Sequence, residues 1–62
     1  PYKDKNLENL LINIYSSNIL SKKGIIVIHR HKKEDDIIPK NYKILEEKFY
    51  GISKIIFLSI LN

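Results

Sequence analysis

The chain has 62 residues, with 11 basic and 7 acidic side chains, a net charge of +4 and no cysteine. This length limits it to one domain at most, and so small a domain buries only about 60% of the surface that its unfolded chain exposes. Without cysteine, the chain has neither a disulfide framework nor a thiolate metal site to stabilise it.

Two interpretations of the positive charge stay open. The charge can serve an anionic partner, or it can follow from AT-rich coding, since the chain holds 13 Ile, 10 Lys and 6 Asn but one Arg and no Ala. The longest apolar run, at 55–61, is too short to span a bilayer, and the sequence shows no basic-then-apolar leader pattern. We therefore expect a cytoplasmic protein without a membrane partner.

An amphipathic helix is predicted near the start of the chain. Asp4 or Asn6 can cap its first turn, because a short side-chain oxygen accepts a hydrogen bond from a free backbone amide. The sequence SKKG at 21–24 is expected to end the segment, with lysines before the glycine. The apolar face follows the i, i+3, i+4, i+7, i+8 spacing and consists of Leu7, Leu10, Leu11, Ile14 and Tyr15.

Three strands are predicted to follow. The first, at 25–29, opens with β-branched residues at 25–28 that do not alternate with polar ones, so cover is expected on both of its faces, as in a parallel-type strand. A charged, proline-broken loop leads to a second strand at 42–50, whose charges on both faces are typical of a sheet edge. A turn at 51–53 then precedes an almost wholly apolar strand at 54–61, which is expected inside the sheet.

These strand types predict the order of the sheet. All three are satisfied when the last strand lies in the middle, hydrogen-bonded to both others and antiparallel to its hairpin partner. A single helix covers one face of such a sheet, so the other face and the far edge of the first strand lack cover within the chain. We interpret 1–62 as a single partial domain, completed by more of the same chain, a partner or a second copy.

The order of these elements resembles the C-terminal part of the S-adenosylmethionine-dependent methyltransferases with a Rossmann-like α/β sheet. Many of these enzymes carry a four-residue signature before the helix: Asp or Asn, then Pro, Pro, and Tyr or Phe. Pro1 and Tyr2 match its last two positions. The paired leucines, the strand GIIVI, Pro39 before YKIL and the YG turn are more closely similar to the bacterial small-subunit ribosomal RNA methyltransferases that modify the exocyclic amine of guanine.

This resemblance implies catalytic roles for Pro1 and Tyr2. Tyr2 matches the aromatic position that stacks on the extruded base, and Pro1 matches a rigid turn. The acceptor residue that orients the amine and the glycine-rich turn that binds S-adenosylmethionine do not occur in the sequence. The 62 residues alone are therefore expected to be inactive, with the cofactor bound by the upstream part of a parent enzyme. The alternative is that both are ordinary residues before a helix.

A basic run, HRHKK at 29–33, is the second candidate site. It is expected at the same sheet edge as Tyr2, where a basic cluster beside a stacking aromatic is typical of nucleic-acid binding. The alternative is a solvated loop, neutralised by the acidic residues at 34–36. The residues predicted to contact ribosomal RNA or the small ribosomal subunit are Arg30, His31, Lys32 and Lys33.

A metal site is not predicted. His29 and His31 flank Arg30 on a strand end, so both imidazoles are expected on one face, as in a His-x-His metal ligand pair. No third ligand of matching reach is evident in the sequence.

Two other functions stay open. One is a stand-alone interaction module that dimerises through its open sheet face. The residues encoded just before Pro1 distinguish it, since Asp-Pro or Asn-Pro there favours the enzyme and a start codon favours the module. The other is a fragment of a DNA amino-methyltransferase, which shares the four-residue signature and is separated only by substrate tests.

Overall fold

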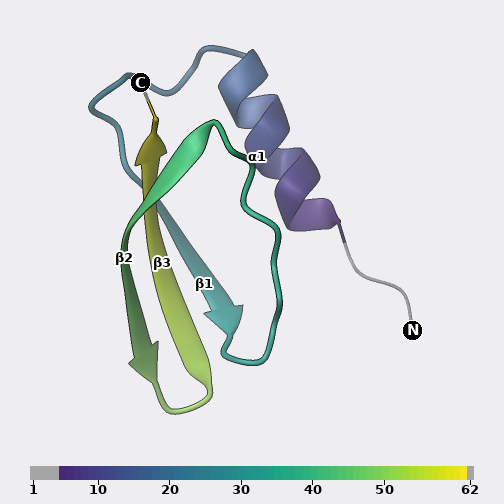
Figure 1. The fold of residues 1–62 in the computed structure, drawn as a ribbon, viewed down its shortest axis with the longest axis vertical. Helices are drawn as coiled ribbons and strands as arrows, with labels where there is room; N and C mark the ends of the chain where they lie inside the picture. Colours follow the sequence, from purple (N-terminus) through teal and green to yellow (C-terminus); the bar gives the residue numbers. More distant parts are fainter. Residues whose placement is uncertain (1–4, 62) are drawn as a thin grey trace.

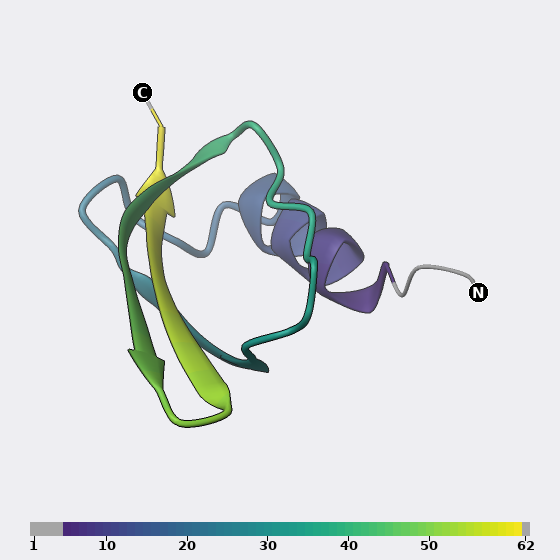
Figure 2. The ribbon, with the colours of Figure 1, turned by 60° about the horizontal axis from the view of Figure 1, so that its bottom comes forward.

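The computed structural model describes residues 5–61, which form one helix followed by three strands (Figure 1). The helix packs on one face of the sheet through Leu11 (Figure 2). Within the described range, no helix combines the length and apolar character needed to cross a membrane. The elements in chain order are α1 (Asn6–Ser16), β1 (Ile26–His31), β2 (Tyr42–Tyr50) and β3 (Ser53–Ile60).

The sheet has the order β1-β3-β2, which confirms the prediction that the last strand lies in the middle. β3 pairs antiparallel with both neighbours, so β1 and β2 run in the same direction on its two sides. Leu58 shows this best, because it pairs with Ile26 on one side and Ile44 on the other. The fold shown is a small α+β unit with an open, all-antiparallel sheet; the Rossmann-like α/β sheet that the resemblance implies extends beyond these three strands.

α1 ends earlier than the sequence predicted. Its last residue is Ser16, and Asn18 adopts a φ of 57°, the left-handed conformation that follows many helices. The amides of Ser17 and Asn18 donate to the carbonyls of Asn13 and Tyr15 and so close the last turn. The prediction that SKKG ends the helix was wrong, because asparagine also tolerates the left-handed region.

The start of α1 also differs from the prediction. Lys5 occupies the N-cap position without a side-chain capping hydrogen bond, and Asn6 is already the first helical residue. The other predicted cap, Asp4, lies outside the described residues. Glu8 does stand in the first turn, where a negative charge favours the positive end of the helix dipole.

β1 is covered on one face only, where the sequence predicted cover on both. Burial alternates along it: Ile28 is buried, Ile26 is half-buried, and Val27 between them is 58% exposed. The strand also runs to His31, two residues beyond its predicted end. The reason is that α1 supplies apolar contacts to a single face of the sheet, so the second β-branched face has no counterpart among the described residues.

β2 lies at the sheet edge, as predicted, but a β-bulge changes which side chains share a face. Ile44 pairs with Leu58 while Glu46 pairs with the adjacent Phe57, so Leu45 is an extra residue. One extra residue reverses the alternation beyond it, because side chains along a strand repeat every second position. Glu46 therefore points away from α1, contrary to the alternation expected from the sequence.

The bulge defines the sheet face opposite α1, which we call the open face. Its members follow from the pairing, since directly paired residues project to the same side. They come from all three strands and are Val27, His29, His31, Lys43, Glu46, Lys48, Tyr50, Ser53, Ile55, Phe57 and Ser59.

The β2–β3 connection confirms the predicted turn. Tyr50 pairs with Ser53, which leaves a two-residue loop of Gly51 and Ile52. Gly51 has a φ of 56°, whereas Ile52 is not among the residues with positive φ. A positive φ at the first loop residue alone is the signature of a type II′ hairpin turn, whose twist matches that of the strands.

The core lies between α1 and the sheet. Leu58 at the centre of β3 and Leu11 on α1 have almost no exposed surface, while Leu10 of the predicted apolar helix face is 55% exposed. The Tyr42 hydroxyl donates a 2.6 Å hydrogen bond to the carbonyl of Leu11, and its ring meets that of Tyr15 edge to face at 6.3 Å. The buried hydrophobic residues are Leu11, Ile28, Tyr42, Ile56 and Leu58.

The buried Tyr42 makes the free energy of unfolding depend on pH in the alkaline range. Burial raises the pKa of Tyr42 above its usual 10.0. The contribution of Tyr42 to the free energy of unfolding is fully present below pH 10. It is lost as the pH rises through the folded-state pKa, at up to about 1.4 kcal/mol per pH unit. Tyr42→Phe is expected to lower the free energy of unfolding by about 1 kcal/mol at neutral pH, with the difference shrinking above pH 10.

Urea unfolding at a series of pH values measures this difference. Tyr50→Phe is the matched control, because Tyr50 is an exposed tyrosine on the same strand. A Tyr42→Phe difference that stays constant from neutral to strongly alkaline pH would contradict the assignment.

Candidate nucleic-acid interface

The predicted basic run lies where β1 ends and the β2–β3 hairpin turns. The amide of Glu34 donates to the carbonyl of His31 at 3.0 Å, which closes a tight turn after the strand. The amide of Lys32 donates to the carbonyl of Ile52 at 2.8 Å and ties this turn to the hairpin. Lys32 and Lys33 are exposed at its tip, accessible to a large anion.

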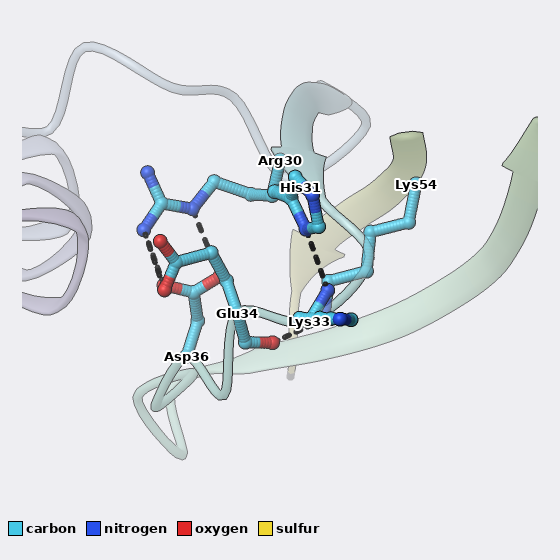
Figure 3. Close-up of polar contacts among 6 residues, drawn as sticks. All are labelled: Arg30, His31, Lys33, Glu34, Asp36 and Lys54. Carbon is cyan, nitrogen blue, oxygen red and sulfur yellow. Dashed lines mark hydrogen bonds and ion pairs between the residues drawn. The ribbon is translucent and has the colours of Figure 1, made fainter. Parts of the chain in front are cut away.

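Arg30 binds a carboxylate of its own chain (Figure 3). Its Nε and Nη2 donate to the two carboxylate oxygens of Asp36 at 2.9 and 2.8 Å, and Nη2 lies 4.0 Å from Glu34. The Asp36 side chain is 5% exposed and that of Arg30 is 26% exposed. A two-point pair between guanidinium and carboxylate is strong and geometrically specific. The guanidinium therefore anchors the loop after β1, and a phosphate contact by Arg30 requires it to leave Asp36.

Lys54 is part of the same group, and the sequence analysis missed it. It pairs with Arg30 across β1 and β3, is buried, and donates from Nζ to the carbonyl of Glu34 at 2.6 Å (Figure 3). Two neighbouring cations thus hold the acidic loop against the helix-covered face of the sheet. The sequence did contain a signal for Lys54. It is the one charged residue in the apolar strand at 54–61, and it lies two and four positions before Ile56 and Leu58, which places its side chain on the same face as theirs.

The two histidines project to the same face of the sheet, as predicted, and this is the open face. His29 Nε2 lies 2.9 Å from the Ser53 hydroxyl, and His31 Nδ1 accepts a 3.0 Å hydrogen bond from the amide of Lys33. Because Nδ1 accepts this hydrogen bond, the neutral tautomer of His31 that fits it carries its proton on Nε2. In residues 5–61, no three groups from His, Asp and Glu come together as a metal site.

The predicted catalytic residues cannot be compared with this site. Pro1 and Tyr2 lie outside the described residues, so their roles and their position relative to 29–33 stay predictions. Of the residues predicted to contact RNA, the structure places Lys32 and Lys33 at an exposed turn and His31 beside them. It places Arg30 on the opposite side of the strand, bound to Asp36.

The open face is apolar near its centre and charged toward β2. Ile55 and Phe57 of β3 are half-exposed beside the exposed Val27. Lys48 lies 5.9 Å from the centre of the Phe57 ring and 3.8 Å from the Glu46 carboxylate. The apolar part adjoins the free edge of β1, whereas the charged part adjoins the bulged edge of β2.

Comparisons with models of known protein families, with curated proteins and with solved structures give no match for this chain.

The pair between Arg30 and Asp36 is expected to stabilise the fold. Asp36→Ala removes two charge-assisted hydrogen bonds from a largely covered guanidinium. We expect a loss of about 2 kcal/mol in the free energy of unfolding, measured with urea. Glu47→Ala, which removes an exposed carboxylate from β2, is the control and is expected to change stability by less than about 0.5 kcal/mol. Equal, small effects of both substitutions would show that the pair contributes nothing.

Proposed function

We propose that this chain is the C-terminal part of a Rossmann-like, S-adenosylmethionine-dependent methyltransferase that modifies the exocyclic amine of guanine in small-subunit ribosomal RNA. The observation that carries the proposal is the position of β3, inserted antiparallel between β1 and β2. A helix, a strand and a hairpin whose last strand is inserted in this way are what the resemblance implies for the end of such an enzyme.

The contrast between the two sheet edges supports the proposal. The edge of β2 carries charged residues and a bulge, which are common protections against pairing with a further strand. The edge of β1 carries consecutive β-branched residues at 25–28 and an unbroken register with β3. Such a run is typical of a strand buried inside a parallel sheet. In the proposed parent, a strand from upstream in the chain pairs with this edge.

The open face gives the second support. Val27, Ile55 and Phe57 form an apolar area on the face of the sheet that α1 does not contact. Contiguous exposed apolar surface of this kind marks a contact with something else. The upstream part of the parent, which also binds the cofactor, covers this face. The dimerising interaction module is the second candidate function, because a second copy would cover the same three residues.

Tyr2 and Pro1 carry the catalytic part of the proposal. The lone pair of an exocyclic amine is delocalised into the ring, so the base must be held firmly with its amine aligned for attack. Tyr2 stacks on the extruded guanine, and Pro1 fixes the turn that positions it. S-adenosylmethionine, bound by the upstream part, supplies the methyl group.

The test compares the 62-residue chain with a longer product of its reading frame that carries Asp-Pro or Asn-Pro before Pro1. With labelled S-adenosylmethionine and small ribosomal subunits, the longer product is expected to methylate guanine and the 62-residue chain to be inactive. In the longer product, Tyr2→Ala is expected to lower kcat/KM by roughly 5- to 150-fold, because stacking on one base contributes about 1–3 kcal/mol.

Tyr2→Phe is the control, since it keeps the stacking ring and is expected to keep most of the activity. Turnover by the 62-residue chain, or full activity of Tyr2→Ala, would overturn the assignment. Methylation of adenine or cytosine in DNA, without methylation of ribosomal RNA, would favour the DNA amino-methyltransferase.

A further inference from the structure

Four lysines gather at the end of the sheet opposite the basic run. We call this group, Lys22, Lys23, Lys40 and Lys43, the lysine end. The first two lie in the segment before β1, the third lies just before β2, and the fourth is the second residue of β2. Because β1 and β2 run in the same direction on the two sides of β3, their starts lie at one end of the sheet (Figure 1). All four side chains are exposed.

The lysine end carries four positive charges, the same number as the net charge of the protein. Of the 11 basic and 7 acidic residues, removing these four lysines leaves 7 of each sign. No ion pair within the described range involves any of the four. The acidic residues at 34–36 follow β1 at its other end. Glu46 is three residues beyond Lys43, about 10 Å along the strand, which is about one Debye length at ~0.1 M salt.

The predicted basic run has a different electrostatic setting. Its arginine is bound to Asp36, the nearby Lys54 is buried against the carbonyl of Glu34, and three acidic residues follow directly in the chain. Lys32 and Lys33 remain exposed there. With Arg30 and Lys54 they make four cations beside the three acidic residues 34–36, so this end keeps an excess of one positive charge. The larger excess of positive charge therefore lies at the lysine end.

We propose that the lysine end binds the phosphate backbone of a nucleic acid. Lysine ammonium groups are compact charges that contact phosphates without reading sequence. The two strand starts lie two strand spacings apart, about 10 Å, which is about the length of three nucleotides in a helical strand. This inference rests on the proposed function for the choice of RNA as the nucleic acid, and it adds a second contact region at the sheet end opposite the predicted basic run.

The chain itself offers a matched pair of variants for the test. Lys22-Lys23 and Lys32-Lys33 are exposed lysine pairs in the loops at the two ends of β1, and only the second is followed by acidic residues. Binding of a short fluorescein-labelled oligouridylate to the full chain is measured by fluorescence anisotropy between about 50 and about 200 mM salt. Circular dichroism of each variant verifies that the exposed substitutions leave the fold unchanged.

K22Q/K23Q is expected to weaken binding roughly three- to tenfold at the lower salt concentration, and to reduce the slope of log affinity against log salt by about 1.4, or about 0.7 for each lost contact. K40Q/K43Q is expected to have a similar effect. K32Q/K33Q is expected to change the affinity less than about twofold, because the three acidic residues that follow its lysines in the chain lower the local positive charge and repel phosphate.

Three results would overturn the proposal. One is a loss of binding in K32Q/K33Q but not in K22Q/K23Q, which would place the RNA contact at 29–33. The second is an absence of oligouridylate binding at about 50 mM salt. The third is tighter binding to phosphatidylserine vesicles than to oligouridylate, lost in K22Q/K23Q, which would assign the lysines and the adjacent, 76% exposed Ile19 to a lipid surface. Failure of the proposed function shows up separately, as an absence of methyl transfer by the longer product.

Discussion

The arrangement depends on the one-sided burial of β3, the central strand. Ile56 and Leu58 project toward α1 and are buried, whereas Ile55 and Phe57 between them project to the open face and are only half-covered. β1 shows the same division, with Ile28 buried and Val27 exposed. β2 is exposed along most of its length, and Ile44 and Phe49 are uncovered even on the side that faces α1. Apolar surface on both faces of a central strand is stable in water only when both faces are covered. α1 covers only one of the two faces of β3.

The two ends of the sheet differ in how their positive charges are used. At the end of β1, Arg30 binds the Asp36 carboxylate and Lys54 binds the carbonyl of Glu34, so these two cations hold the acidic loop in place. At the start of β1 and β2, the lysines face solvent without described acidic partners. A basic sequence run is therefore a poor guide to a basic surface in this chain. The net charge left after internal pairing is the better guide to where an anion would bind.

The order of the sheet was predictable from the sequence because charges mark β2 as an edge strand and an apolar run marks β3 as the central strand. The bulge at Leu45 was not predictable, since it depends on how Glu46 registers against β3. The contacts of Asp36 and Lys54 were missed because hydrogen bonds between separate segments are set by tertiary packing. The placement of His29 and His31 on one face was predictable from strand alternation alone.

The most direct test of the central claim is sedimentation equilibrium of the isolated 62-residue chain, combined with binding of a fluorescent hydrophobic dye. The claim is that the open face requires a covering surface from elsewhere. We expect the isolated chain either to self-associate or to bind the dye strongly, and Phe57→Ser to weaken both. A stable, dye-free monomer that unfolds cooperatively would show that the sheet tolerates an uncovered face, and would contradict the claim.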